Sequence, residues 1–384
     1  DAPGQKMRKE ACARLGTWRC YFIDLPEKIE KEDKTWVDVK DANSVIYHFG
    51  KEKVMEFIDN AQEIPITDVI DLSEADDFDI ENAPGLYSGI KSLDNIVYKF
   101  LFGSVVILTG ARGSGKSSLL NEIFVAESLN QGYDVFVFSG ELSAPILKSW
   151  IETTLAGHEK IVMKNQFVRV INPEVKKSIR EWYSRRVWMY DGTDNDESKI
   201  LDRAINAVRK FGVKVIILDN LMTLSLGNSD DNNIWQCQKK FIVKLVSLAI
   251  SLNVLIVLVA HPRKMNREFT RLVADDVAGS NDLGNLSQYI LSVHRYTKAE
   301  KEGEKDNKGN FKKGKEPINF DANIEVFKNR YFGKIGDADV YFDYNSMRFY
   351  EDNQGFWKRY KWDSKNTSPI PKTIPQKKEE NPFV

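Results

Sequence analysis

Cysteine is scarce in this 384-residue chain, and long apolar runs are absent. The three cysteines, Cys12, Cys20 and Cys237, stand in no Cys-x-x-Cys spacing and cannot form a complete set of disulfides, which favours a reducing compartment. The longest apolar stretches, such as residues 254–260, have the length of a strand and fall short of the roughly 20 residues that span a bilayer. The start also lacks the basic-then-apolar pattern of a signal peptide. These absences predict a protein that is neither secreted nor held in a membrane.

An excess of charge of one sign is also missing. Lys and Arg number 55 against 56 Asp and Glu, for a net charge of −1. A polyanionic partner would therefore have to be held by local basic patches and not by the field of the whole chain. Because 42% of the residues are hydrophobic, the chain can bury a large core, and its length predicts one large domain and a smaller one.

Composition and pattern divide the chain into four stretches, namely 1–50, 51–84, 85–362 and 363–384. The first alternates a helix (Gln5 to Leu15), a strand (Trp18 to Asp24) and the end of another unit around 40–43, and it looks like the tail of an α/β domain whose earlier part precedes residue 1. The second is a linker that consists of a helix over 51–63 and an acidic, irregular segment over 64–84. The last has prolines and lysines without periodicity, which predicts a disordered tail.

Residues 85–362 alternate apolar strands with helices. Strands are expected near 104–109, 134–139, 187–190, 214–218, 254–260, 289–294, 322–328 and 338–343, and helices near 116–131, 144–156, 198–211 and 234–252. Near-continuous apolar strands separated by helices predict an α/β fold with a mostly parallel sheet covered on both faces. Residues 299–317 have almost nothing apolar, so an exposed excursion between two strands is expected there.

The strongest motif is Gly-Ala-Arg-Gly-Ser-Gly-Lys-Ser at residues 110–117, a complete phosphate loop between an apolar strand and a helical pattern. In such loops, backbone N–H groups surround phosphate oxygens and the helix N-terminus adds its positive dipole end. Lys116 is predicted to reach the β- and γ-phosphates, and Ser117 to hold Mg²⁺. The predicted nucleotide-binding residues are Gly110, Arg112, Gly113, Ser114, Gly115, Lys116, Ser117 and Ser118.

Two later strands end in carboxylates. The strand over 134–139, expected beside the phosphate-loop strand, runs into Glu141, which would orient or deprotonate an attacking water. The strand over 214–218 ends at Asp219, whose carboxylate would bind Mg²⁺ opposite Ser117. A cap or a solvated strand end is the alternative for each carboxylate, and the upstream phosphate loop favours the catalytic interpretation.

A polar residue and a basic segment follow the strand over 254–260. His261 lies where a side chain could sense the γ-phosphate, although a lone histidine is usually structural. The segment that follows, with its glycine and its cations, could grip a nucleic acid backbone or could simply be solvated. The residues predicted to bind DNA are Arg263, Lys264, Arg267, Arg271, Gly279, Ser280 and Asn281.

Lys328 and Arg330 stand two residues apart, which would place both cations on one side of a strand. Two converging cations suit a triphosphate, and a guanidinium adds planar hydrogen bonding. Because the pair is remote from the phosphate loop, it could act on the nucleotide of a neighbouring subunit. An exposed strand face is the alternative.

In this order, the motifs resemble the ring-forming replicative helicases of the DnaB class, which have a RecA-like core, and within them the primase-helicases of phages and of the mitochondrial Twinkle type. The resemblance covers roughly residues 85–350. It is carried by the sequences at 110–117, 139–143, 215–221, 261–264, 278–280, 328–330 and 342–349.

The resemblance implies a homo-hexameric or heptameric ring that uses ATP and Mg²⁺, moves 5′ to 3′ on single-stranded DNA and opens forked duplex DNA. It implies Glu141 as the catalytic carboxylate, His261 as the phosphate sensor, and Arg330 as an arginine finger that acts in trans with Lys328. It places Arg295 and Tyr344 against the base. It further implies a replisome DNA polymerase and single-strand-binding protein as partners, in a bacterial or phage-infected cytoplasm or an organelle matrix.

The first residues add a second resemblance. Asp1 to Gly4 resemble the second half of the Asp-x-Asp-x-x-Gly metal motif of Toprim primase domains, and 40–43 resemble that domain's end. Because a lone carboxylate cannot assemble a two-metal site, we expect no primase activity from this chain and no catalytic role for Asp1. Two other functions are compatible with the phosphate loop: a filament-forming recombinase with the same core, and a small-molecule kinase.

Overall fold

We analysed a computed structural model of the chain. It describes residues 2–16, 19–23, 25–63, 70–192, 195–221, 234–262, 271–272, 276, 281–305, 310–312, 314–366 and 368–375. The chain divides into two compact units, residues 1–81 and 82–384. In the described residues, no helix combines the length and apolar character needed to cross a bilayer.

The first unit is small. It contains α1 (Ala2–Leu15), β1 (Tyr21–Phe22) paired with β4 (Gln62–Glu63), β2 (Lys28–Glu30) paired with β3 (Trp36–Asp38), and α2 (Ala42–Asp59). Helix α2 begins earlier than the expected residue 51, because Asp41 and Ser44 form a reciprocal capping box at its start. Gly50, with φ of 84°, interrupts the helical pattern in the middle. The stretch 40–43 therefore contains the start of a helix.

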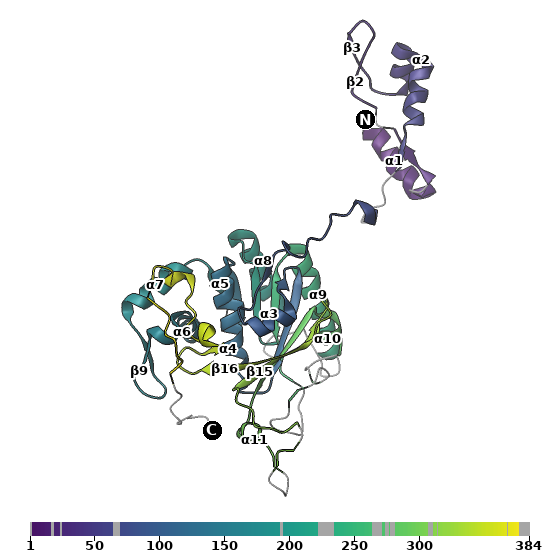
Figure 1. The fold of residues 1–384 in the computed structure, drawn as a ribbon. Helices are drawn as coiled ribbons and strands as arrows, with labels where there is room; N and C mark the ends of the chain where they lie inside the picture. Colours follow the sequence, from purple (N-terminus) through teal and green to yellow (C-terminus); the bar gives the residue numbers. More distant parts are fainter. Residues whose placement is uncertain are drawn as a thin grey trace. The chain divides into compact units, whose positions relative to one another are not determined.

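The second unit is built on a nine-stranded sheet (Figure 1). Its strands lie in the order β11-β8-β12-β13-β7-β14-β15-β16-β17. The pairs from β11 to β14 are parallel and those from β14 to β17 are antiparallel. Their bounds are β7 (Ser104–Gly110), β8 (Val135–Ser139), β11 (Val187–Met189), β12 (Val215–Asp219), β13 (Leu255–Val259), β14 (Tyr289–Arg295), β15 (Ala322–Asn329), β16 (Gly336–Asp343) and β17 (Arg348–Tyr350). The predicted α/β sheet with a parallel majority is confirmed.

Helices cover both faces of this sheet. One face carries α3 (Lys91–Val97), the continuous helix α4–η3–α5 (Lys116–Leu119, Leu120–Glu127, Ser128–Gln131), α6 (Ala144–Ala156) and α7 (Pro173–Tyr183), and the other carries α8 (Glu197–Phe211) and α9 (Ile234–Leu252). Side chains of β7 point alternately to the two faces of the sheet, so that Val106 and Leu108 belong to one core cluster and Val105 and Ile107 to the other. Strand order differs from expectation, because β13 and β12 separate β8 from β7.

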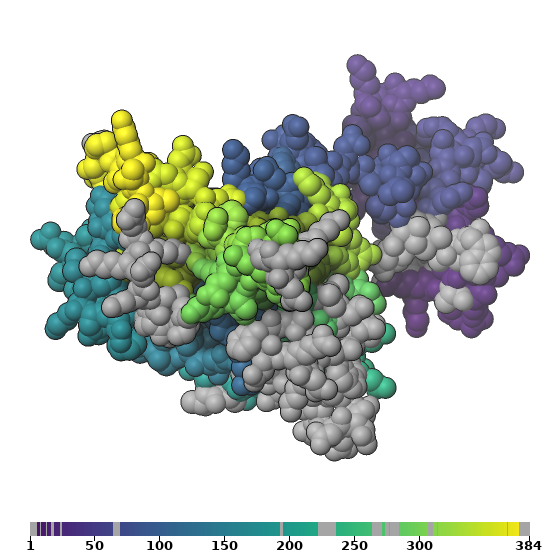
Figure 2. Space-filling view, turned by 60° about the horizontal axis from the view of Figure 1, so that its bottom comes forward, coloured from purple at the N-terminus to yellow at the C-terminus, as the bar shows by residue number. Residues whose placement is uncertain are grey.

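The end of the chain packs over the first face. Figure 2 shows the C-terminal residues, in yellow, against the teal segment that contains α6 and the hairpin β9 (Ile161–Met163) and β10 (Arg169–Ile171). Arg348 Nε donates to the carbonyl of Thr154 at 2.6 Å. Arg359 donates to the carbonyl of Ser368, beyond Asp363, at 2.7 Å. The disorder predicted over 363–384 stays a prediction. Residues 376–384 lie outside the described part.

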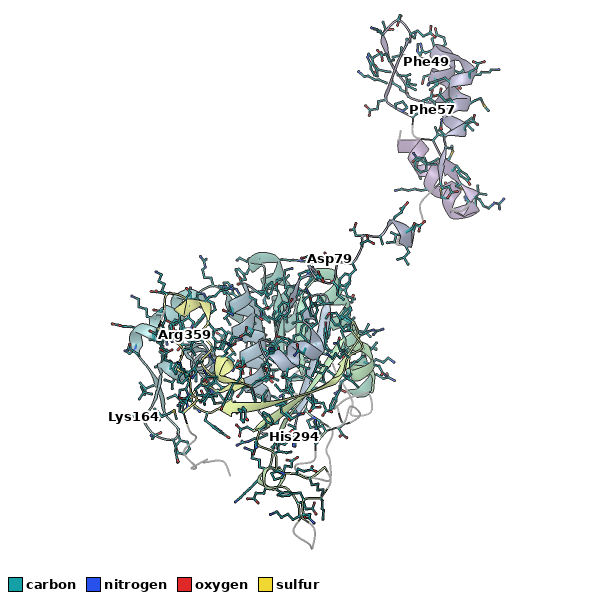
Figure 3. All side chains as sticks on the ribbon, viewed as in Figure 1. Phe49, Phe57, Asp79, Lys164, His294 and Arg359 are labelled. Carbon is teal, nitrogen blue, oxygen red and sulfur yellow. The ribbon has the colours of Figure 1, made fainter. Side chains whose placement is uncertain are left out.

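The expected excursion over 299–317 projects between β14 and β15. It includes α11 (Lys298–Glu302), and it leaves the sheet beyond His294, which Figure 3 labels. Thr297 and Glu300 form a capping box at its start, and His294 Nε2 lies 2.9 Å from Glu300 Oε1. The stem of the excursion is thus fixed to the edge of the sheet at which the parallel strands end.

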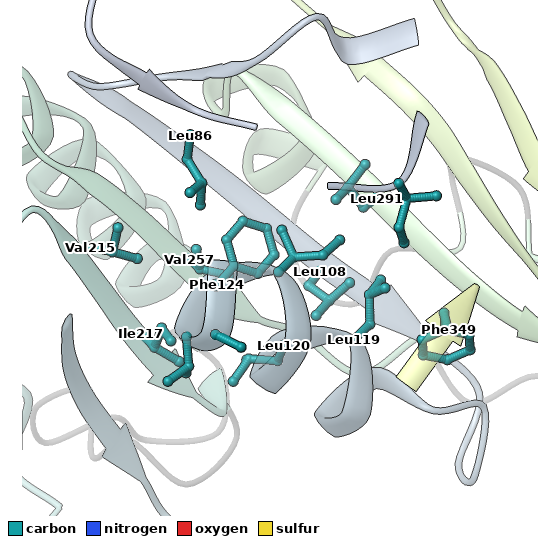
Figure 4. Packing of buried hydrophobic residues seen from close by; sticks show 14 of the residues in the cluster. Leu86, Leu108, Leu119, Leu120, Phe124, Val215, Ile217, Val257, Leu291 and Phe349 are labelled. Atoms are coloured by element: carbon teal, nitrogen blue, oxygen red, sulfur yellow. The ribbon is translucent and has the colours of Figure 1, made fainter. Parts of the chain in front are cut away.

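Phe124 lies in the hydrophobic core, with no exposed surface (Figure 4). Its ring packs 5.3 Å from that of Phe100. Replacing Phe124 with Ala is expected to lower the free energy of unfolding by about 3–5 kcal/mol, because the cavity adds to the lost burial. Urea unfolding followed by circular dichroism measures this loss. Ile250→Ala, at a side chain that is 63% exposed, is the control and should change little; equal losses would contradict the packing.

Candidate functional site

The phosphate loop joins β7 to α4 with the backbone that its glycines allow. Gly110, Gly113 and Gly115 have φ of 151°, 72° and 99°. A Cβ on Gly110 would lie 2.5 Å from the carbonyl oxygen of Val293, and one on Gly115 would lie 2.9 Å from the ring of Phe349. No side chain caps the N-terminus of α4, so its first N–H groups face the loop. The loop is therefore a close-fitting cradle of backbone donors.

Lys116 is buried at the centre of the cradle. Its Nζ donates to the carbonyls of Gly110 and Ala111, at 2.8 Å each. Burial lowers the pKa of Lys116 to about 8, although the carboxylates of Asp219 and Glu141 oppose that shift. Beside it, the buried Oγ of Ser114 has no hydrogen-bond partner within the described part of the protein. A buried cation and an unpaired hydroxyl are what a bound phosphate group would satisfy.

Asp219 and Glu141 follow the ends of adjacent strands. Strands β12 and β8 pair so that Asp219 lies opposite Ser139, and Gly140 N donates to the carbonyl of Asp219 at 2.6 Å. Asp219 is 8% exposed, and burial raises its pKa to about 6, with the nearby Glu141 adding to the rise. Such a carboxylate is stabilised by a cation.

Asn220 joins the catalytic candidates and was not predicted from the sequence. Its Nδ2 donates to Glu141 Oε1 at 2.5 Å and lies 3.0 Å from His261 Nε2. The ring nitrogen lies 3.5 Å from the same carboxylate oxygen. The position of Asn220, one residue beyond the Asp219 strand end, was the only signal available in the sequence. The amide orients a glutamate and a histidine that come from two other strands.

His261 follows β13, between the strand of Asp219 and that of the phosphate loop. Burial lowers its pKa, and the charge on Lys116 lowers it further. The lowered pKa favours the neutral imidazole, whose Nε2 accepts from Asn220 at 3.0 Å. A neutral ring does not repel the nearby charge of Lys116.

Arg295 and Tyr344 lie together at the same edge. Arg295 ends β14, two residues after Val293, which pairs with Gly110. Its Nη2 donates to the Tyr344 hydroxyl at 2.8 Å, and the guanidinium lies 5.9 Å from the ring centroid. The predicted contact of these two residues with a base stays a prediction.

Lys328 and Arg330 lie toward the opposite edge. Asn329 pairs with Tyr289, four residues before Val293 along β14, so this end of β15 is roughly 13 Å from Gly110 along the strand direction. Strand β15 ends at Asn329, and the exposed Arg330 lies in the following turn, not on the strand face as expected. Lys328 Nζ donates to the carbonyls of Gly284 and Asn285 at 2.7 and 2.8 Å. Burial and the nearby Arg330 lower the pKa of Lys328.

Most of the predicted DNA-binding segment lies outside the described residues. This holds for Arg263, Lys264, Arg267, Gly279 and Ser280. Asn281 begins α10 (Asn281–Leu286). Arg271 is described, and its guanidinium contacts acidic side chains of β15 and β16.

Two oxygen-bearing side chains beside the phosphate loop could hold a metal ion, one a hydroxyl and the other a carboxylate. Ser117 is the first residue after Lys116 in α4, and Asp219 presents its carboxylate near Lys116, as their mutual effect on pKa shows. Mg²⁺ takes oxygen ligands and usually adds phosphate oxygens and water to one or two protein groups. The donor set of Ser117 and Asp219 therefore fits Mg²⁺.

Comparison with known proteins shows which family this chain matches. The family model described as DnaB-like helicase C terminal domain matches residues 85–351. The Twinkle homolog protein, chloroplastic/mitochondrial, of Arabidopsis thaliana is 24% identical over 369 residues, which cover 89% of this chain and 47% of that protein. The Primase homolog protein of the same plant is 38% identical over 66 residues, covering 17% and 18% of the two chains. The chain thus spans about half the length of the first relative.

Solved structures show the same fold. One of them, described as an ATPase domain, has a TM-score of 0.57 at 16% identity, covering 82% of this chain and all of that one. A DnaB-like replicative helicase, studied with its interactions with primase, has a TM-score of 0.56 at 16% identity, covering 79% and 72%. Because the matched stretch 85–351 holds every described residue of the site and more than half of the sequence, the chain belongs to the DnaB-like helicase C-terminal domain family.

Proposed function

We propose that this chain is the ATP-driven motor of a replicative DNA helicase, with each ATP hydrolysed between two copies of the chain. One observation carries the proposal. Lys116, Asp219, Glu141 and His261 converge at one edge of the sheet, whereas Arg330 lies beyond the opposite end of β15. A site that needs a cation from a second copy suits a ring, in which each copy faces the next.

The residues of one copy bind the nucleotide and orient the attacking water. The phosphate loop N–H groups and Lys116 hold the β- and γ-phosphates, and Glu141, fixed by Asn220, orients the attacking water and accepts its proton. Ser117 and Asp219 would hold Mg²⁺, which would neutralise charge on the phosphate oxygens. Arg295 and Tyr344 are proposed to contact the base.

The neighbouring copy supplies Arg330, with Lys328 beside it. An arginine finger stabilises charge that develops on the transferred phosphoryl group. Loss of the γ-phosphate would be registered by His261 and passed to the segment that follows it, which we propose contacts single-stranded DNA. The proposed assembly is a hexamer, or a heptamer, that travels 5′ to 3′ in a bacterial or phage-infected cytoplasm or an organelle matrix. A replisome polymerase and a single-strand-binding protein are the proposed partners.

Unwinding of a forked DNA tests this function. We expect strand separation that requires ATP, Mg²⁺ and a 5′ tail on the fork, and rings in single-particle images of the same sample. A fork with only a 3′ tail is the matched control. Unwinding from the 3′ tail would reverse the proposed polarity, and open filaments with strand exchange would indicate a recombinase. Hydrolysis that no DNA stimulates would contradict a DNA motor.

The low pKa of Lys116 predicts a pH dependence of nucleotide binding. In the free protein Lys116 is charged below about pH 8 and loses its proton above it. A bound triphosphate holds the charged form, so affinity should fall by up to about tenfold per pH unit above pH 8. Calorimetric titration with a non-hydrolysable ATP analogue measures this. Lys116→Arg stays charged, and its affinity should be flat over the same range; an equal decline in both proteins would assign the effect to another group.

A further inference from the structure

Arg271 is held by the sheet, although its basic character suggested a DNA contact. Its Nε donates to Glu325 Oε2 at 3.1 Å and its Nη2 to Asn323 Oδ1 at 2.9 Å. The same Nη2 lies 3.5 Å from Asp337 Oδ2. Two of its three nitrogens therefore contact groups of β15 and β16, and the side chain remains 43% exposed.

The acceptors of Arg271 are fixed in turn. Asn323 is fully buried, and its Nδ2 donates to Asp337 Oδ2 at 2.8 Å and to Asp339 Oδ1 at 2.7 Å. Asn323 pairs with Asp339 across the strands, and Glu325 pairs with Asp337. The site is therefore a set of four side chains on one face of two adjacent strands, and it presents a preformed fork of oxygens to a guanidinium.

A phosphate would be a poor ligand at this place. Glu325 and Asp337 contact the one guanidinium. A third carboxylate, Asp339, binds the same Asn323 and accepts the Tyr296 hydroxyl at 2.6 Å. The local balance of these four charged groups is negative. A DNA backbone that approached Arg271 would meet like charge and would have to compete for donors already in use.

We propose that Arg271 is a positioning residue, which is held on β15 and β16 and does not contact DNA. The inference rests on the proposed function. Strand β15 continues from Glu325 to Lys328, and Arg330 follows it. Arg271 is thus attached to the strand whose end would serve the neighbouring nucleotide.

Salt dependence separates positioning from contact. Binding of a fluorescent oligo(dT) to the 384-residue chain is measured over a range of salt, because each lost phosphate contact reduces the slope of log affinity against log salt by about 0.7 for single strands. Arg271→Ala should keep the wild-type slope while its DNA-stimulated turnover falls by roughly tenfold. Arg203→Ala, an exposed position on α8, is the matched control and should leave both quantities unchanged. A slope reduced by about 0.7 in Arg271→Ala would assign the residue to DNA and overturn the proposal.

Glu325→Gln is a second test, for which positioning and DNA contact predict different changes in DNA affinity. If Arg271 is a positioning residue, loss of the negative charge on the acceptor of its Nε should lower DNA-stimulated turnover at unchanged DNA affinity. Added to Arg271→Ala, Glu325→Gln should then reduce turnover by less than it does alone. If Arg271 contacts DNA, removal of the neighbouring negative charge should raise DNA affinity, and that result would overturn the proposal. Failure of the wild-type chain to hydrolyse ATP in response to DNA would instead refute the proposed function.

Discussion

Replacing Arg330 with Ala is expected to reduce DNA-stimulated ATP turnover by about 10³-fold or more, with nucleotide affinity largely intact. The affinity should survive because the phosphate loop, Lys116 and Asp219 come from the other copy. Turnover should fall because the transition-state charge loses its planar cation. Steady-state phosphate release with saturating oligo(dT) measures turnover, and titration with an ATP analogue measures binding. Near-normal turnover would contradict the trans role.

Mixing two inactive variants tests whether the finger comes from a neighbour. Arg330→Ala keeps an intact phosphate-loop side, and Glu141→Gln keeps an intact finger. In a mixed ring, some interfaces join the phosphate loop of the first to the finger of the second, and these are complete. Mixtures should therefore recover part of the wild-type turnover, with a maximum at intermediate ratios. If mixtures show only the sum of the two residual activities, Arg330 does not act across an interface.

The matched control is Arg209→Ala. Arg209 is exposed in the last turn of α8, so its loss removes the same charge without touching a strand end. It should keep wild-type turnover and ring formation. Equal losses in both variants would indicate a general effect of charge on assembly, and the structural placement of Arg330 would then not explain its role.

Local pattern was enough to predict the parts of the site that lie within one strand and its following turn. The phosphate loop needs glycines at 110, 113 and 115 because the backbone there has positive φ, and the sequence displays that need directly. Asp219 and His261 were found because each follows a short apolar run of strand length. Their approach to the phosphate loop follows from parallel pairing, which brings the carboxyl ends of strands to one edge.

Contacts between segments that are distant in the sequence could not be predicted from it. Strand β8 was expected beside β7, but in the structure β12 and β13 lie between them. The pattern of an apolar strand does not indicate which strands are its neighbours. Asn220 went unnoticed because its role depends on two residues from other strands. The ion pairs of Arg271 went unnoticed too, because a basic residue in a polar segment gives no sign of the carboxylates that face it. In each case the missing information was tertiary.

Replacing Glu141 with Gln is expected to lower ATP turnover by about 10²–10⁴-fold, the range for loss of a general base. The side chain is 53% exposed, so it can reach a water, and Asn220 holds one of its oxygens at 2.5 Å. Gln has the same shape and cannot accept the proton. ATP should therefore bind and remain, and the variant should stay bound to single-stranded DNA. Single-turnover hydrolysis with radiolabelled ATP measures the loss.

Asn220→Ala separates the chemistry of the carboxylate from its placement. That variant keeps the base and loses the amide that orients it, so turnover should fall less than in Glu141→Gln. Because Asn220 also touches His261, its loss should uncouple hydrolysis from DNA: basal turnover should drop less than DNA-stimulated turnover. Glu181→Gln, at an exposed glutamate of α7, is the control for charge loss and should behave as wild type. Full activity in Glu141→Gln would assign the base to another group, and the convergence of Glu141, Asn220 and His261 would then serve to sense the nucleotide and not to cleave it.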